Sequence, residues 1–352
     1  GIDGKGEYAT TFLGYGENGK IHKIKEFYDP DSLGGLYGAM TEYLGFDMLD
    51  GEFKVMGMAP YGDATKYDLS DLAKFEDGEL VVNTKLVNVV GMRRYKENGK
   101  GYYFTPELIK RLGPKREGDE IDDPYIHYAA SIQALLEKLA LEMIEYYLGD
   151  IIRETGKIVM AGGVALNVKL NQRIISLPHV KELFVQPASG DNGTSLGAAT
   201  FAANSAGEKI HKMEHVYLGP KFSSEECVAA CEAHPEKPVF TKVDNFPQKA
   251  AELLAAGHPL AWLQGRMEFG PRSLGCRSIL GDPSYPGVAD RINAQIKYRE
   301  RWRPFCPSML DRVAEDLLQT DHPAPYMTFT FDVNPAWNDR IPEVVHEDGT
   351  AR

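Results

Sequence analysis

Two runs of strand-forming residues begin the hydrophobic pattern of the chain. The runs 9–15 and 21–28 are separated by a short polar stretch that contains Asn18 and Gly19. Because Asn-Gly favours the tight turns that join antiparallel strands, this pattern predicts a β-hairpin.

The next hundred residues are less regular. Residues 32–49 follow a helical pattern, and the glycines and proline of 54–62 predict a loop that lies against this helix. Residues 81–123 are polar and weakly periodic. We expect short strands and solvated loops there, and not a binding patch around Arg93 and Arg94.

The middle of the chain alternates helices, short strands and glycine-rich turns. Apolar residues recur at helical spacing over 128–148, which predicts a long helix facing the core. The elements expected after it are a strand at 157–160, a turn at Gly162-Gly163, a helix to about 177, a strand at 183–186, a loop at 187–193 and a helix from 194. This repeated order predicts an α/β domain.

A change in composition divides the chain near residue 215. Polarity rises over 204–221, and Gly219-Pro220 interrupts the pattern. We therefore expect one domain over 1–215 and a second over 216–352. The second domain is again of α/β type, and its expected elements are a helix capped by Ser223 and Glu226, a strand at 238–243, a helix at 246–256 and a buried strand at 260–263.

Composition and charge narrow the classes of protein. The 352 residues are 43% hydrophobic and 26% charged, which is enough for two globular cores. No stretch resembles a membrane helix or a secretory leader, and four irregularly spaced cysteines do not form a disulfide framework, so we expect a cytoplasmic protein with reduced thiols. The net charge of -12 argues against a nucleic-acid partner.

One region opposes this acidic balance. We call residues 265–303 the arginine-rich segment; its cations are Arg266, Arg272, Arg277, Arg291, Lys297, Arg299, Arg301 and Arg303, against Glu268, Asp282, Asp290 and Glu300. Guanidinium groups bind phosphate and carboxylate oxygens bidentately, and nearby glycines expose further N–H donors. Two alternatives remain: the arginines pair with acids such as Glu268 and Asp282, or the alternation of cations and aromatic residues over 298–305 packs at a domain seam.

Glycine turns offer a second kind of anion site. Gly162-Gly163 and Gly190-Asp191-Asn192-Gly193 each follow a predicted strand and open a helix, where free N–H groups attract phosphate. Asp3-Gly4 forms a third such turn. The glycines can also be purely steric, and Asp191 either reaches a metal ion or caps the helix that follows it.

Seven segments carry a family resemblance across the whole chain. They begin at Asp3, Lys54, Ala129, Gly162, Gly190, Glu268 and His346, and read DGKGEYATT, KVMGMAPYG, AASIQ, GGVALN, GDNG, EFGPRSLG and HEDGTAR. Together they resemble the O-carbamoyltransferases of nodulation and antibiotic biosynthesis, the NodU/CmcH family.

The resemblance implies an α/β fold of two parts. It implies part of an actin-like ATPase (ASKHA) domain, followed by part of a YrdC-like domain, similar to threonylcarbamoyl-AMP synthase. The implied activity is ATP-dependent transfer of a carbamoyl group from carbamoyl phosphate, through carbamoyl-adenylate, to a hydroxyl of a sugar or another secondary metabolite. The implied cofactors are ATP and a divalent metal, iron in the family and magnesium with the nucleotide.

The resemblance also implies roles for individual residues. It makes Arg272, Arg303 and Arg352 the catalytic holders of oxyanions, and Asp191 the metal ligand. The implied nucleotide contacts are Asp3, Gly4, Gly162, Gly163, Asn167, Gly190, Asn192 and Gly193. The remaining substrate contacts that we expect are Arg266, Arg277, Ser278 and His346.

Two family features are missing from the sequence. The family's metal-binding histidine pair precedes the position that matches Gly1, and an Asn-Thr-Ser-Phe-Asn stretch follows the position that matches Arg352. We therefore expect a chain truncated at both ends and inactive alone. Two alternatives are a relative that transfers threonylcarbamoyl to tRNA, which the net charge disfavours, and a catalytically incomplete nucleotide-binding fragment.

Overall fold

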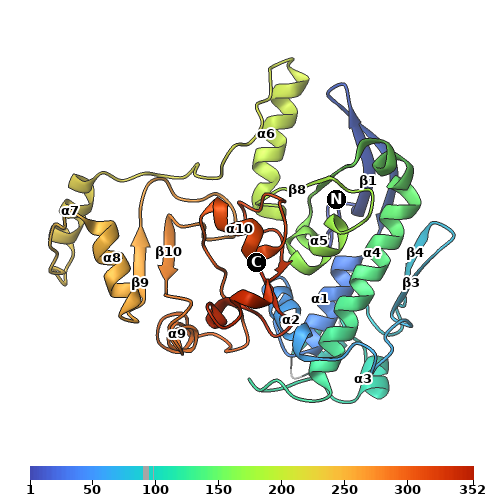
Figure 1. The fold of residues 1–352 in the computed structure, drawn as a ribbon. Coiled ribbons are helices and arrows are strands. Elements are labelled where there is room, and N and C mark those ends of the chain that lie inside the picture. The colour runs from blue at the N-terminus through green and yellow to red at the C-terminus, as the bar shows by residue number, and fades with distance from the viewer. Residues whose placement is uncertain (90–94, 98) are drawn as a thin grey trace.

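The computed structural model describes residues 1–89, 95–97 and 99–352, so the expectation for Arg93 and Arg94 lies outside the described residues (Figure 1). The fold is mixed α/β. In the described part every paired strand belongs to a two-stranded sheet, and one of these sheets, β7 with β8, is parallel.

The N-terminal hairpin has the geometry that its turn residues favour. β1 (Ala9–Glu17) pairs antiparallel with β2 (Lys20–Tyr28). Asn18 and Gly19 have φ angles of 51° and 74°, the left-handed values that a tight hairpin turn requires. The predicted hairpin is confirmed.

The long helix α4 (Tyr125–Thr155) lies at the centre of the core (Figure 1). Leu136, Leu139 and Met143 recur on one face and are buried, as the helical spacing predicts. The other elements of this part are α1 (Leu33–Tyr43), α2 (Glu52–Met58), β3 (Ala73–Glu76), β4 (Glu79–Val82), β5 (Tyr95–Glu97), β6 (Lys100–Tyr102), α3 (Pro106–Leu112), β7 (Lys157–Met160), α5 (Val168–Ile175), β8 (Glu182–Val185) and α6 (Thr194–Ser205).

The second half contains shorter elements. They are α7 (Ser224–Ala233), α8 (Phe246–Ala255), β9 (Leu260–Leu263), β10 (Arg277–Leu280), α9 (Val288–Ile292), α10 (Asp311–Leu318), β11 (Phe331–Asp332) and β12 (Thr350–Ala351). The capping box of α7 is confirmed: Glu226 N donates to Ser223 Oγ at 3.1 Å, and Ser223 N donates to Glu226 Oε2 at 2.7 Å.

The loop predicted at 54–62 is wrong. Most of it forms α2, which continues into a 3-10 turn at Ala59–Tyr61. Pro60 lies in the first turn of that 3-10 helix, where its missing N–H costs nothing. Val55 and Met58 are fully buried, and this packing outweighs the low helix propensity of the glycine.

Two strand expectations in the second half also fail. Residues 238–243 form no strand, and Val239 is 99% exposed because no described strand pairs with this stretch. The strand at 260–263 exists as β9, but it is not buried, since Leu263 is 59% exposed. Among the described strands β9 pairs with β10 alone, so its other edge has no strand partner.

A seam joins residues 299–305 to the first part of the chain. The rings of Trp302 and Phe46 are 6.3 Å apart, and the Arg116 guanidinium lies 4.9 Å from the Phe46 ring and 5.9 Å from the Trp302 ring. Lys54 and Glu300 form an ion pair of 2.8 Å. The cation and aromatic alternation over 298–305 therefore packs at a seam, as one of the two alternatives predicted.

Candidate functional site: an arginine pocket and a group of glycine turns

A pocket of about 70 Å³ opens between α2, α5 and the last part of the chain. Residues distant in sequence form its walls, from Phe53 on α2 to Arg352 at the end of the chain. Its basic and ionisable lining residues are Lys169, Arg272, Arg299, Arg303, His346 and Arg352. The small volume suits one tetrahedral or planar anion.

Most of these guanidinium groups lack a carboxylate partner. Arg272 donates one long hydrogen bond of 3.4 Å to the Leu166 carbonyl, and its buried Nε has no partner among the described residues. Arg299 donates to Asn293 Oδ1 at 2.6 Å, and Arg352 Nε to Cys306 Sγ at 3.1 Å. Arg303 alone of the four forms an ion pair within the described residues, at 3.3 Å from Glu300.

The proximity of these cations is unfavourable without an anion. Burial, and then the charges of Arg352 and Arg303, lower the pKa of Arg272 to about 10. Burial, and then Arg303 and Arg352, lower the pKa of Arg299 to about 10 as well. A bound anion would remove both the repulsion and the unmet hydrogen bonds, so the charge of the pocket favours a negative ligand.

The pocket contains four of the seven residues expected to hold oxyanions or substrate. Arg272, Arg303, Arg352 and His346 lie together in it. Arg299 and Lys169 were not predicted. Arg299 belongs to the same arginine-rich segment, and this could have identified it, whereas Lys169 is an ordinary helix lysine with no sequence signal.

The structure does not bring Arg266, Arg277 and Ser278 into the pocket. Arg266 is exposed, with one long contact of 3.3 Å to the Leu218 carbonyl. Arg277 donates to the carbonyls of Gln264 and Cys276, at 2.8 Å and 2.7 Å. The hydroxyl of Ser278 lies 2.6 Å from that of Ser273.

Arg266 lies near the start of a loop organised around Glu268, and Arg277 and Ser278 begin the strand β10 that follows this loop. One oxygen of this buried carboxylate accepts the backbone N–H groups of Leu274, Cys276 and Arg277 at 2.8, 2.7 and 3.2 Å. Burial alone would raise the pKa of Glu268, but these N–H groups outweigh it and lower the pKa. Glu268 therefore shapes the loop and forms no ion pair with an arginine among the described residues, so the pairing alternative is wrong for this residue.

The glycine turns lie next to the N-terminal end of α5. Gly162 N donates to Ser189 O at 2.7 Å, and Val164 N donates to Ile2 O at 3.1 Å. Asp3 Oδ1 lies 3.0 Å from the position that a Cβ on Gly163 would occupy. The turn at 162–164 thus contacts the chain both at residues 2–3 and at Ser189.

The glycines differ in why they are needed. A Cβ on Gly162, whose φ is 94°, would lie 2.1 Å from Ile2 O, so this glycine has a steric role. A Cβ on Gly190 would meet nothing closer than 3.8 Å. Asn167 caps α5 through Leu170 N at 3.0 Å and exchanges two hydrogen bonds with Gln133, at 3.0 and 2.9 Å. The nucleotide contacts themselves stay predictions.

The fit of a metal ion at Asp191 is poor. Asp191 is exposed, and across the ranges that the structure describes no three His, Cys, Asp or Glu side chains gather as a ligand set. The alternative role also fails, because α6 begins after Gly193 without a side-chain cap. The described residues therefore do not fit a metal site at Asp191.

Comparison with known proteins identifies the family. Residues 1–200 match Carbamoyltransferase N-terminus, and residues 251–352 match Carbamoyltransferase C-terminus. Nodulation protein NolNO of Sinorhizobium fredii is 35% identical over 360 residues, which cover 100% of this chain and 50% of that protein. Nodulation protein NolO of Bradyrhizobium diazoefficiens is 33% identical, over 100% of this chain and 62% of its own length.

A third relative matches a shorter region. Nodulation protein U of Rhizobium tropici is 37% identical over 194 residues, which cover 55% of this chain and 32% of that protein. The chain thus spans about half the length of the first of these curated relatives. Within the described ranges, no helix has the length and apolar character needed to cross a bilayer. With both parts matched in order, the chain belongs to the carbamoyltransferase family.

Proposed function

We propose that this chain binds carbamoyl phosphate in the arginine pocket and ATP at the three glycine turns, for transfer of the carbamoyl group to a hydroxyl of a sugar or another secondary metabolite. The observation that carries the proposal is the meeting of Arg272, Arg299 and Arg352 in one small pocket without a carboxylate partner among the described residues. Membership of the carbamoyltransferase family supports the choice of ligand.

The proposed chemistry needs a cationic and enclosed site. Hydrolysis of carbamoyl phosphate consumes one water molecule, releases phosphate and leaves carbamate, whose oxygen then attacks the α-phosphorus of ATP and displaces pyrophosphate. The acceptor hydroxyl next attacks the carbonyl carbon of carbamoyl-adenylate, loses its proton and displaces AMP. The guanidinium groups stabilise the oxyanions of phosphate and carbamate, because preorganised donors act most strongly where little water competes.

The proposed ATP site and most of the proposed carbamoyl phosphate site lie in different parts of the chain. In this proposal, residues 1–215 form an actin-like ATPase domain that holds the nucleotide at the glycine turns. Residues 216–352 form a YrdC-like domain that supplies most of the arginines. Lys169 on α5 and Phe53 on α2 extend the pocket from the first domain, which supports a carbamoyl site at the junction of the two.

Calorimetric titration with carbamoyl phosphate tests this proposal. We expect the wild-type chain to bind it, and Arg352→Met to bind it about 10- to 100-fold more weakly, because one charge-assisted contact contributes about 1.5–3 kcal/mol. Arg301→Met is the matched control, since Arg301 is exposed and pairs with Asp290 at 2.6 Å, outside the pocket. Equal losses in both variants, or no binding by the wild type, would contradict the proposal.

A further inference from the structure

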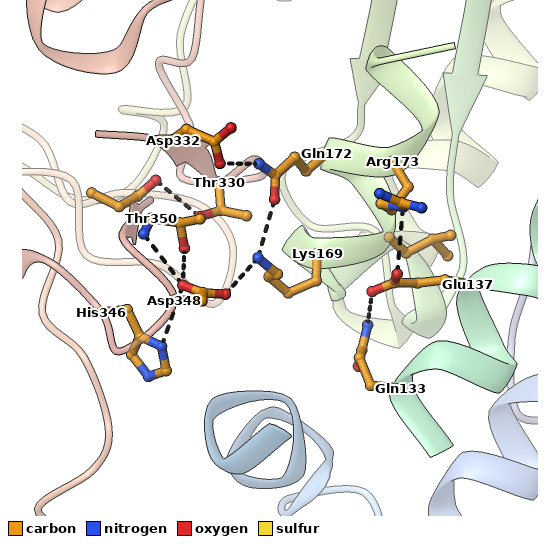
Figure 2. A network of polar contacts seen from close by, with 12 residues as sticks. Gln133, Glu137, Lys169, Gln172, Arg173, Thr330, Asp332, His346, Asp348 and Thr350 are labelled. Carbon is orange, nitrogen blue, oxygen red and sulfur yellow. Dashed lines mark hydrogen bonds and ion pairs between the residues drawn. The ribbon is translucent and has the colours of Figure 1, made fainter. Parts of the chain in front are cut away.

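Asp348 lies beside the pocket and contacts three residues that line it (Figure 2). Its Oδ2 accepts a hydrogen bond of 2.7 Å from Lys169 Nζ. Its Oδ1 accepts one of 2.7 Å from Thr350 Oγ1 and lies 3.7 Å from His346 Nδ1. One carboxylate thus contacts a lysine, a hydroxyl and an imidazole of the anion site.

The carboxylate also stabilises the turn that carries it. His346 N donates to Thr350 O at 2.9 Å, and Gly349 N donates to His346 O at 2.9 Å, which closes the turn. Thr350 N donates to Asp348 Oδ1 at 3.3 Å. The turn begins at His346 and leads directly into β12 and Arg352. Its conformation therefore determines the positions of both the His346 and the Arg352 side chains in the pocket.

α5 connects this turn to the first part of the chain. Lys169 Nζ also donates to Gln172 Oε1 at 3.2 Å, and Gln172 Nε2 donates to Asp332 Oδ1 at 3.1 Å (Figure 2). Asn171 Nδ2 donates to Thr328 O at 2.8 Å. Three side chains of one short helix therefore attach the segment that contains β11 and β12.

The charge of Asp348 favours its contacts with Lys169 and His346. Burial opposes ionisation, but the contacts with His346, Lys169 and Thr350 outweigh it and hold the pKa of Asp348 far below its ordinary range. The carboxylate is therefore negative at neutral pH. Lys169 has three N–H donors, two of which go to Asp348 and Gln172, so the third remains for an anion.

We propose that Asp348 is a positioning residue of the anion pocket, which fixes Lys169, His346 and the approach of Arg352 without contacting the ligand itself. This inference rests on the proposed function, because it requires that the pocket binds a phosphate-type anion. His346 Nε2, buried and without a partner among the described residues, is the ring atom that this arrangement leaves for the ligand.

Two measurements on the same variants test the inference. Calorimetry gives the dissociation constant for inorganic phosphate, and hydrogen exchange of the backbone amides of residues 346–350 reports the turn without ligand. We expect Asp348→Asn to bind phosphate about tenfold more weakly and to exchange faster in the turn, as on loss of a supporting contact. Asp348→Glu, which keeps the charge, should restore binding to within about threefold of wild type.

Asp290→Asn is the matched control, because Asp290 also pairs with a cation, Arg301 at 2.6 Å, but neither residue lines the pocket. It should leave phosphate binding and exchange of the turn unchanged. If the wild type binds phosphate and Asp348→Asn binds equally well, or if its turn exchanges at the wild-type rate, this inference alone is wrong. If the wild type does not bind phosphate, the proposed function is wrong, and the inference that depends on it is wrong as well.

Discussion

The arginine-rich segment places the same side chain in two opposite environments. Arg272 and Arg299 are drawn into a pocket where burial and neighbouring cations lower the pKa of each to about 10. Arg266 and Arg301 are exposed, and Arg301 pairs with Asp290 at 2.6 Å. Local density of arginine therefore does not define a site. What separates the two groups is whether solvent or a partner within the chain already satisfies the charge.

The largest effect should come from Arg272→Met. We expect about 100-fold weaker phosphate binding, or about 3 kcal/mol, because the methionine fills the space but donates nothing. The free energy of unfolding without ligand should stay unchanged or rise by up to about 2 kcal/mol, since an unpaired buried charge is removed. Calorimetry and urea unfolding measure the two quantities. A loss of both phosphate affinity and free energy of unfolding would show that Arg272 has a structural role. The distinction between pocket arginines and exposed arginines such as Arg266 would then be wrong.

A smaller effect should follow from Glu268→Ala, which removes the acceptor of three backbone N–H groups. We expect a loss of about 2 kcal/mol in the free energy of unfolding, because these donors are left without a partner. Phosphate affinity should change far less than in Arg272→Met. Urea unfolding measures the loss, and stability equal to wild type would mean that the loop does not depend on this carboxylate.

The contribution of Glu268 to the free energy of unfolding should decrease as the pH falls. Since hydrogen bonds lower the pKa of Glu268 in the folded state, its contribution is complete above the ordinary glutamate range and is lost as pH falls through the lower, folded value. The stability difference between wild type and Glu268→Gln should therefore shrink on acidification from neutral pH. A difference that grows in acid would contradict this assignment.

The smallest effect should come from Arg266→Ala. Arg266 has one long contact with the Leu218 carbonyl and lies in solvent. We expect a change within about 0.5 kcal/mol in the free energy of unfolding and an unchanged affinity for phosphate. A loss of affinity comparable to that of Arg272→Met would show that Arg266 also contributes to phosphate binding. The distinction between the two groups of arginines would then be wrong.

Local sequence signals explain which parts of the fold were predictable. The hairpin at Asn18-Gly19, the long helix α4 and the capping box of α7 each depend on residues close in sequence, and all three are confirmed. α2 was missed because burial of Val55 and Met58 overrides a glycine and a proline. The strand expected at 238–243 failed because strand formation also needs a partner, which no local pattern supplies.

The site divides in the same way. Arg272, Arg303, Arg352 and His346 were named through the family resemblance, and the pocket contains them all. Lys169 carries no local signal, and Asp348 lies in a segment of the family resemblance that assigned it no role. Their roles arise from a contact across 179 positions of the chain. Such pairings follow from tertiary packing and cannot be derived from spacing or charge along one chain.

The seam around Trp302 determines how much rearrangement the pocket needs when a ligand arrives. Mutual repulsion would separate the cations of the pocket, and the packing of Trp302 against Phe46 and Arg116, with the ion pair of Lys54 and Glu300, resists that separation. The electrostatic work of assembling the cations is therefore done during folding. In the proposed function, the reorganisation energy left for the binding step is correspondingly small, because the donors already lie together before the ligand arrives.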